Sequence, residues 1–156
     1  MSLERAKAHL KQYGLDGCII IPEKTSATVA EAAEALGCSP AEIAKTLSFL
    51  LEEGPILIVV EGTARIDSKK FKAVFHQKAK MIPADRVNDL VGHEPGGVCP
   101  FGVKEGVRVY LDESLKRFEV VYPAAGTGRS AVRLTIPELE TCSGYAAWID
   151  VCKEPE

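Results

Sequence analysis

Hydrophobic residues are spaced along the chain in two patterns, one typical of helices and the other of strands. Apolar positions three or four residues apart predict longer helices at 2–13, 28–37, 68–76 and 84–91. Short apolar runs predict strands at 18–21, 46–51, 56–60, 107–111, 118–122, 131–135 and 145–151, with helical turns at 113–116 and 137–141. Because helices and strands interleave early while strands dominate late, we expect an α+β fold around a mixed sheet that is strongly curved or closed.

The length of the chain is that of one domain. Its 156 residues contain no repeat, linker or low-complexity tract, and they suffice to bury a core. We therefore expect a single domain, 1–156. No apolar run approaches the ~20 residues of a membrane span, and the first residues lack the apolar core of a signal peptide. These features predict a cytoplasmic protein with no membrane partner.

Metal-binding patterns are missing from the sequence. The five cysteines form no CxxC pair, and the three histidines do not stand near a cysteine at ligand spacing. We expect reduced thiols, no metal and no cofactor.

Charge is distributed unevenly. The net charge of the chain is −3, yet residues 65–86 carry seven basic and two acidic side chains, a local charge of +5. The predicted helix at 68–76 would bury Phe71, Val74 and Phe75 and turn its lysines outward. A basic face on an acidic protein suits a polyanion. From charge alone, a solvated helix face is an equal alternative.

Residues 92–102, GHEPGGVCPFG, form a loop with four glycines and two prolines. Glycine permits backbone angles closed to other residues, and proline fixes φ and removes an N–H donor. Such a loop holds an irregular backbone whose N–H and C=O groups can meet a ligand. The alternative is a structural turn between two elements.

Several segments resemble the YbaK family of aminoacyl-tRNA deacylases and the related editing domain inserted in bacterial prolyl-tRNA synthetases. Ile43–Leu47 is similar to the family's lysine at the start of a core strand, and Val60–Lys70 to its strand, small-residue turn and lysine-bearing helix. Gly96–Gly102 contains the family's GxxxP loop, and Gly126–Arg129 followed by Pro137–Leu139 is a weaker match. The segments stand in family order.

The resemblance implies a mixed, barrel-like sheet flanked by helices, which agrees with the element count. It also implies hydrolysis of the ester in mischarged tRNA, several relatives acting on tRNA for proline loaded with cysteine, alanine or another small residue. A synthetase pocket separates such side chains by only ~1–3 kcal/mol, so a second site must remove the errors. The implied partners are the tRNA acceptor end and an aminoacyl-tRNA synthetase.

The resemblance further implies a site built on Lys45 and on Gly96 and Gly97, whose loop would supply N–H groups to the developing oxyanion. Lys45 stands at the edge of the expected core, where an ammonium group is costly unless it meets an anion, such as a terminal phosphate or the developing oxyanion. Its ordinary alternative is a lysine that snorkels to the surface. Further substrate-binding residues would be Gly62, Thr63, Val98, Cys99, Pro100 and Gly126. The acceptor stem would be bound by Lys69, Lys70, Lys72, Lys78 and Lys80.

Other interpretations remain open at this point. The chain could be a non-catalytic module that binds aminoacyl-tRNA or a synthetase, or a hydrolase with Cys99 as its nucleophile. His93 could bind tRNA or act as a base, although a loop histidine is more often merely exposed. No Ser or Cys is obviously paired with a base, which favours attack by water or by a substrate group. Ala131 replaces an aspartate of some relatives, which leaves the amino-acid substrate open.

Overall fold

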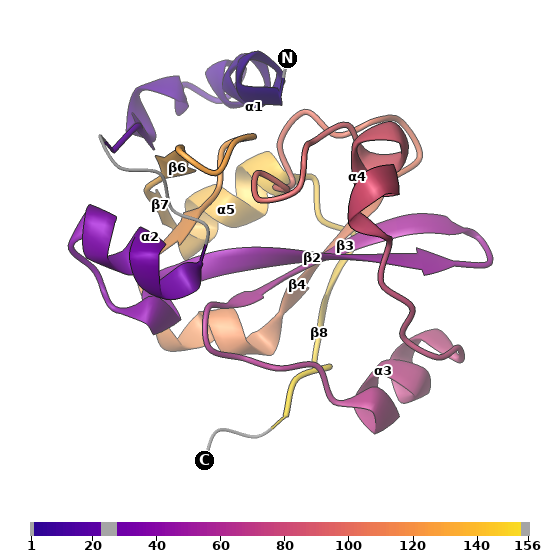
Figure 1. Ribbon diagram of the computed structural model, residues 1–156. Coiled ribbons are helices and arrows are strands. Elements are labelled where there is room, and N and C mark those ends of the chain that lie inside the picture. Colours follow the sequence, from indigo (N-terminus) through magenta and orange to yellow (C-terminus); the bar gives the residue numbers. More distant parts are fainter. Residues whose placement is uncertain (1, 23–27, 154–156) are drawn as a thin grey trace.

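The computed structural model describes residues 2–22 and 28–153, and its centre is a six-stranded mixed sheet (Figure 1). The strands are β2 (Ile43–Leu51), β3 (Gly54–Glu61), β4 (Arg108–Asp112), β5 (Val120–Pro123), β7 (Leu134–Thr135) and β8 (Ala147–Ile149). Their order is β7-β5-β2-β3-β4-β8, with antiparallel pairs at β2–β3 and β5–β7 and parallel pairs elsewhere. The sheet is curled but not closed, since β7 and β8 stand at its two ends.

The long hairpin β2–β3 is the middle of this sheet. The chain reverses at Glu52 and Glu53, directly before Gly54 and Pro55, and the register pairs Lys45 with Val60 and Phe49 with Ile56. Side chains 56 to 60 of β3 are all buried, so both faces of the strand are covered. Successive side chains of β3 therefore pack alternately into two separate cores, one on each face of the sheet.

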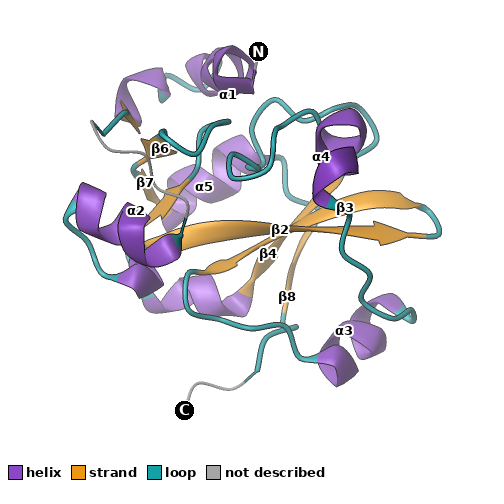
Figure 2. Cartoon of the chain, in the orientation of Figure 1, coloured by secondary structure: helices purple, strands orange, loops and turns teal. Residues whose placement is uncertain are grey.

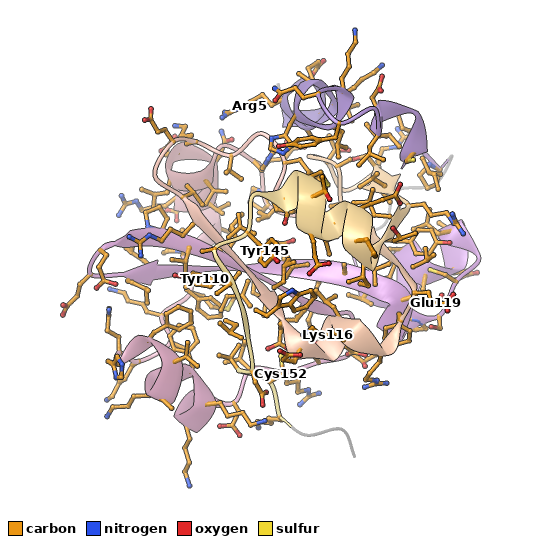
Figure 3. The ribbon with its side chains drawn as sticks, turned by 180° about the vertical axis from the view of Figure 1, so that it is seen from behind. Arg5, Tyr110, Lys116, Glu119, Tyr145 and Cys152 are labelled. Atoms are coloured by element: carbon orange, nitrogen blue, oxygen red, sulfur yellow. The ribbon has the colours of Figure 1, made fainter. Side chains whose placement is uncertain are left out.

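Helices cover both faces (Figure 2). They are α1 (Ser2–Lys11), α2 (Val29–Leu36), α3 (Ser68–Phe75), α4 (Ala84–Val91) and α5 (Ile136–Ser143), with 3₁₀ segments at Asp16–Cys18, Pro40–Glu42 and Glu113–Arg117. Residues of α1, α4 and α5 pack in the larger core, and α3 packs over the opposite face. Tyr110 of β4 contacts Phe75 of α3 there, at 5.1 Å between ring centroids (Figure 3). No helix in the described ranges is long and apolar enough to cross a membrane.

Local signals in the sequence explain several helix ends. Thr28 caps α2 by accepting from the N–H of Glu31, and Gly37 ends the helix in the left-handed conformation. Ser39 N–H donates to Glu42 Oε1 across the 3₁₀ segment. The expected helix at 68–76 begins after Asp67, whose carboxylate accepts from the N–H groups of two lysines that follow.

One expected strand is shorter than predicted, and one expected buried side chain is exposed. The run at 18–21 forms only β1 (Ile19–Ile20), which pairs with β6 (Ala131–Val132) in a separate two-stranded sheet. Ile21 is 59% exposed, because this short strand lies outside the main sheet. Val74 is 38% exposed, since α3 turns Phe71 rather than Val74 to the core.

The edge of β2 that faces β5 loses its partner partway along the strand. Ala44 pairs with Pro123, and the next residue of β2 bridged on this side is Phe49, with Met81. Ile82 N–H donates to Ser48 O. The stretch at 45–47 therefore lies where β5 has diverged and the segment around Met81 has not yet begun.

Candidate active site

A cavity of about 230 Å³ lies at this interruption of the sheet. Its walls come from α2, the start of β2, the end of β5 and two loops, 96–98 and 127–131. Val29, Ala32 and Leu36 of α2 make one wall apolar. The polar part of the lining comes from Lys45, Thr46 and the loop at 127–130. The cavity thus combines an apolar surface with a few polar groups, as ligand sites commonly do.

Lys45 lines the cavity and is half-buried. Burial lowers the pKa of its ammonium group, because a charge loses solvation there. The pKa of the neighbouring Cys152 thiol is raised to about 12, chiefly by burial, so this thiol is neutral at pH 7. The carboxylate of Glu61 is therefore the nearby anion that favours the charged lysine, while Arg65 opposes it.

Thr46 brings a second polar group to the cavity. Its Oγ1 is buried and has no hydrogen-bond partner within the described part of the chain. A buried hydroxyl without a partner costs free energy. The same strand thus places a cation and an unpaired hydroxyl side by side in the sequence.

The glycine-rich loop reaches the cavity through Gly96 and Val98. Gly97 lies between them but packs behind the wall: a Cβ there would stand 2.3 Å from Gly126 O and 2.5 Å from Thr127 N. The N–H of Gly97 donates to Glu94 O within the loop. Gly97 therefore lets the two cavity loops approach each other and is not placed to donate to a substrate.

Cys99 and His93 form the buried interior of the same loop, and both are 0% exposed. His93 Nε2 lies 2.6 Å from Phe101 O and 3.5 Å from Cys99 Sγ. Burial raises the pKa of the Cys99 thiol to about 12 and lowers the pKa of His93. A neutral thiol without access to the cavity does not suit a nucleophile, and the expectation of an exposed His93 is wrong.

Other residues expected at the site lie elsewhere. Gly62 is buried against the 3₁₀ segment, where a Cβ would stand 2.0 Å from Pro40 O, so its glycine serves packing. Thr63 is exposed and its hydroxyl donates to Glu61. Pro100 and Gly126 are buried and, with Cys99, are not among the residues that line the cavity.

The basic residues expected to bind the acceptor stem lie on or after α3 and do not line the cavity: Lys69, Lys70, Lys72, Lys78 and Lys80. Figure 1 shows α2 and α3 near opposite ends of the hairpin β2–β3. Lys70 is paired with Asp150 at 3.1 Å, and the others are exposed.

Sequence reasoning missed the α2 wall, Thr46, Tyr122 and Arg129 as cavity residues. The signal for α2 was present but looked ordinary, because an amphipathic helix normally packs its apolar face on a core. Thr46 directly follows Lys45 and could have been included. Arg129 lies in a Gly-rich connection whose partner loop is about 30 residues away in sequence, so only the fold brings them together.

Comparison with known proteins assigns the chain to a family. Residues 23–142 match the model of the aminoacyl-tRNA editing domain, so the chain belongs to that family. A crystal structure described as "a putative trans-editing enzyme for prolyl tRNA synthetase" superimposes with a TM-score of 0.88 at 30% identity, covering 98% of both chains. The hypothetical protein APE2540 gives a TM-score of 0.80 at 26% identity, over 93% of this chain and 99% of the other.

Among sequences, the chain is 47% identical over the full length of both proteins to "Uncharacterized protein YwhH" of Bacillus subtilis (strain 168). It is 30% identical to the proline–tRNA ligase of Limosilactobacillus fermentum over 95 residues, 57% of this chain and 17% of the ligase. The chain therefore corresponds to a small part of the synthetases that it resembles.

Proposed function

We propose that the protein is a free-standing aminoacyl-tRNA deacylase that hydrolyses the ester of mischarged tRNA. The proposed substrate is tRNA for proline carrying a small amino acid such as cysteine or alanine. The observation that carries the proposal is the convergence of Lys45 and the Gly96–Val98 segment on one cavity. Family membership and the likeness to the trans-editing structure support it.

The proposed chemistry is addition of water to the ester carbonyl. The tetrahedral intermediate carries a negative oxygen, which Lys45 and the backbone N–H groups of Gly96 and Val98 would stabilise. Collapse breaks the bond to the ribose oxygen, which leaves with a proton, and the amino acid is released as its carboxylate. No side-chain nucleophile is required. The adjacent ribose hydroxyl would relay a water proton to the departing ribose oxygen, or solvent would accept it. If a substrate thiol attacked in place of water, its proton would go to the departing ribose oxygen and the product would be a cyclic thioester, which water then opens to the free amino acid.

A panel of mischarged tRNAs, scored for release of free amino acid, tests the activity and its substrate. Lys45→Met keeps the length of the side chain and removes the charge, and we expect deacylation to fall ~100-fold or more. Lys7→Met is the matched control, since Lys7 is an exposed lysine of α1 outside both the cavity and the basic block on α3. Urea unfolding of both variants would verify that the fold is kept.

The outcomes separate the candidate functions. If Lys45→Met released amino acid as fast as the wild type, the role assigned to Lys45 would be wrong. Tight binding of aminoacyl-tRNA by the wild type without any release of amino acid would favour a non-catalytic binding module. Cys99→Ser should retain turnover, because the thiol is buried and neutral.

A further inference from the structure

The charged residues of the cavity lining are two cations. Of the described residues that line it, only Lys45 and Arg129 carry charge, and none is acidic. They come from different walls, Lys45 from the start of β2 and Arg129 from the loop after β5. Lys45 is half-buried whereas Arg129 is exposed, so the arginine marks the rim.

The turn that carries Arg129 is fixed by hydrogen bonds around Ser130. Thr127 donates to Ser130 Oγ from its N–H at 3.2 Å and from its hydroxyl at 2.9 Å. Arg129 N–H donates in turn to Thr127 Oγ1 at 3.2 Å. Ser130 is buried, which anchors the turn while Arg129 projects from it. The rim cation is therefore held by a structured loop.

A substrate acylated at a terminal ribose has two groups for which these cations are suited. The ester carbonyl develops negative charge as it reacts, and the phosphodiester on the other side of the same ribose is a permanent anion. Arginine pairs well with phosphate because its planar guanidinium can donate two parallel hydrogen bonds. A cation in the interior and another at the rim match the order of these two groups.

We propose that Arg129 binds the 3′-terminal phosphodiester of the acylated RNA at the mouth of the cavity. The inference rests on the proposed function and adds to it the path of the nucleic acid, which enters over the 127–131 loop. The lysines of α3 line no part of the cavity. Arg129 thereby sets affinity, and Lys45 acts at the reacting ester.

The test compares acylated RNA with an acylated adenosine that lacks the phosphate. Arg129→Gln should raise KM for a mischarged tRNA roughly tenfold or more and leave kcat nearly unchanged, because the lost contact is to an unreactive group. Hydrolysis of the aminoacyl-adenosine should be the same in variant and wild type. Arg133→Gln is the matched control: this exposed arginine lies close in sequence and does not line the cavity.

A second measurement compares two inhibitors of aminoacyl-adenosine hydrolysis and therefore needs no acylated RNA. AMP should compete better than adenosine in the wild type, and the difference should vanish in Arg129→Gln. An equal KM increase on aminoacyl-adenosine, or no KM increase on tRNA, would overturn the proposal. In either case, turnover by the wild type would still support the deacylase function. A wild type inactive on every ester would contradict both that function and the role of Arg129.

Discussion

At the scale of single residues, the buried ring of His93 has a pKa that burial lowers. Its side chain is 0% exposed, and the ring donates to Phe101 O through Nε2 in the neutral tautomer that this contact favours. Nδ1 is buried without a partner in the described structure. Protonation would add a buried charge and an unpaired donor.

Stability should therefore fall at acid pH in a way that depends on His93. The pKa of His93 in the folded protein is below its ordinary 6.5, mainly through burial and also through the charges of Arg5 and His9 on α1. The unfolded chain then binds the proton more tightly, so this contribution to stability is intact above pH 6.5 and is lost as pH falls toward the folded pKa. One group contributes at most about 1.4 kcal/mol per pH unit.

Urea unfolding at pH 7.5 and 5.5 measures this loss. We expect the wild type to lose more stability over the interval than His93→Gln, which keeps an N–H donor but does not titrate. Parallel losses in the two proteins would contradict the role given to the buried ring.

At the scale of elements, the approach of two loops forms the wall of the cavity opposite α2. Gly97 lies against the peptide between Gly126 and Thr127. The absence of a Cβ at Gly97 therefore lets the glycine-rich loop come this close to the loop after β5. The glycine-rich loop at 92–102 also packs on α1, where Gly102 approaches the backbone of Arg5. The shape of the cavity depends on these contacts.

Gly97→Ala should push the loops apart. Its Cβ would stand 2.3 Å from Gly126 O, so backbone must move, at a cost of about 1–3 kcal/mol, and deacylation should fall with it. Gly106→Ala is the control: its φ of +92° is strained for alanine, but nothing lies within 4 Å of its Cβ. We expect that variant to lose about 1 kcal/mol of stability and no activity. Equal activity in both variants would show that loop spacing is not critical.

Sequence patterns were sufficient for the sheet, for most helices and for the expectation that Lys45 and Gly96 lie on one cavity. They failed where packing, rather than contact with a ligand, explains why a residue is of its type. Gly62 resembles a ligand-approach glycine, yet the carbonyl of Pro40 occupies the space of its Cβ. Cys99 resembles an accessible loop thiol, yet it is buried in the loop. Arg129 has no distinguishing signal, because its significance comes from a loop that is distant in sequence.

At the scale of the whole molecule, the two basic features lie apart. The cavity is near one end of β2, and α3 packs over the opposite face near the other end (Figure 1). We expect a short RNA end bound at the cavity to leave the α3 lysines uncontacted, whereas a folded tRNA is large enough to contact both. On this expectation the basic block affects only long substrates.

Charge reversal on α3 tests this division. Lys69→Glu with Lys72→Glu should raise KM for full-length mischarged tRNA several-fold at low salt and weaken its salt dependence, with no change for an acylated trinucleotide. Lys7→Glu with Lys11→Glu makes the same charge change on exposed positions of α1. If the two double variants behave alike on tRNA, the α3 face is only solvated surface.

The half-buried position of Lys45 has a consequence for the stability of the protein. An ammonium group half removed from water makes the ligand-free protein less stable than an apolar side chain of similar size would. Lys45→Met should therefore unfold at higher urea than the wild type while losing activity. Such a result would mean that the molecule carries a weak point at rest for a charge that the proposed reaction uses only when substrate is bound.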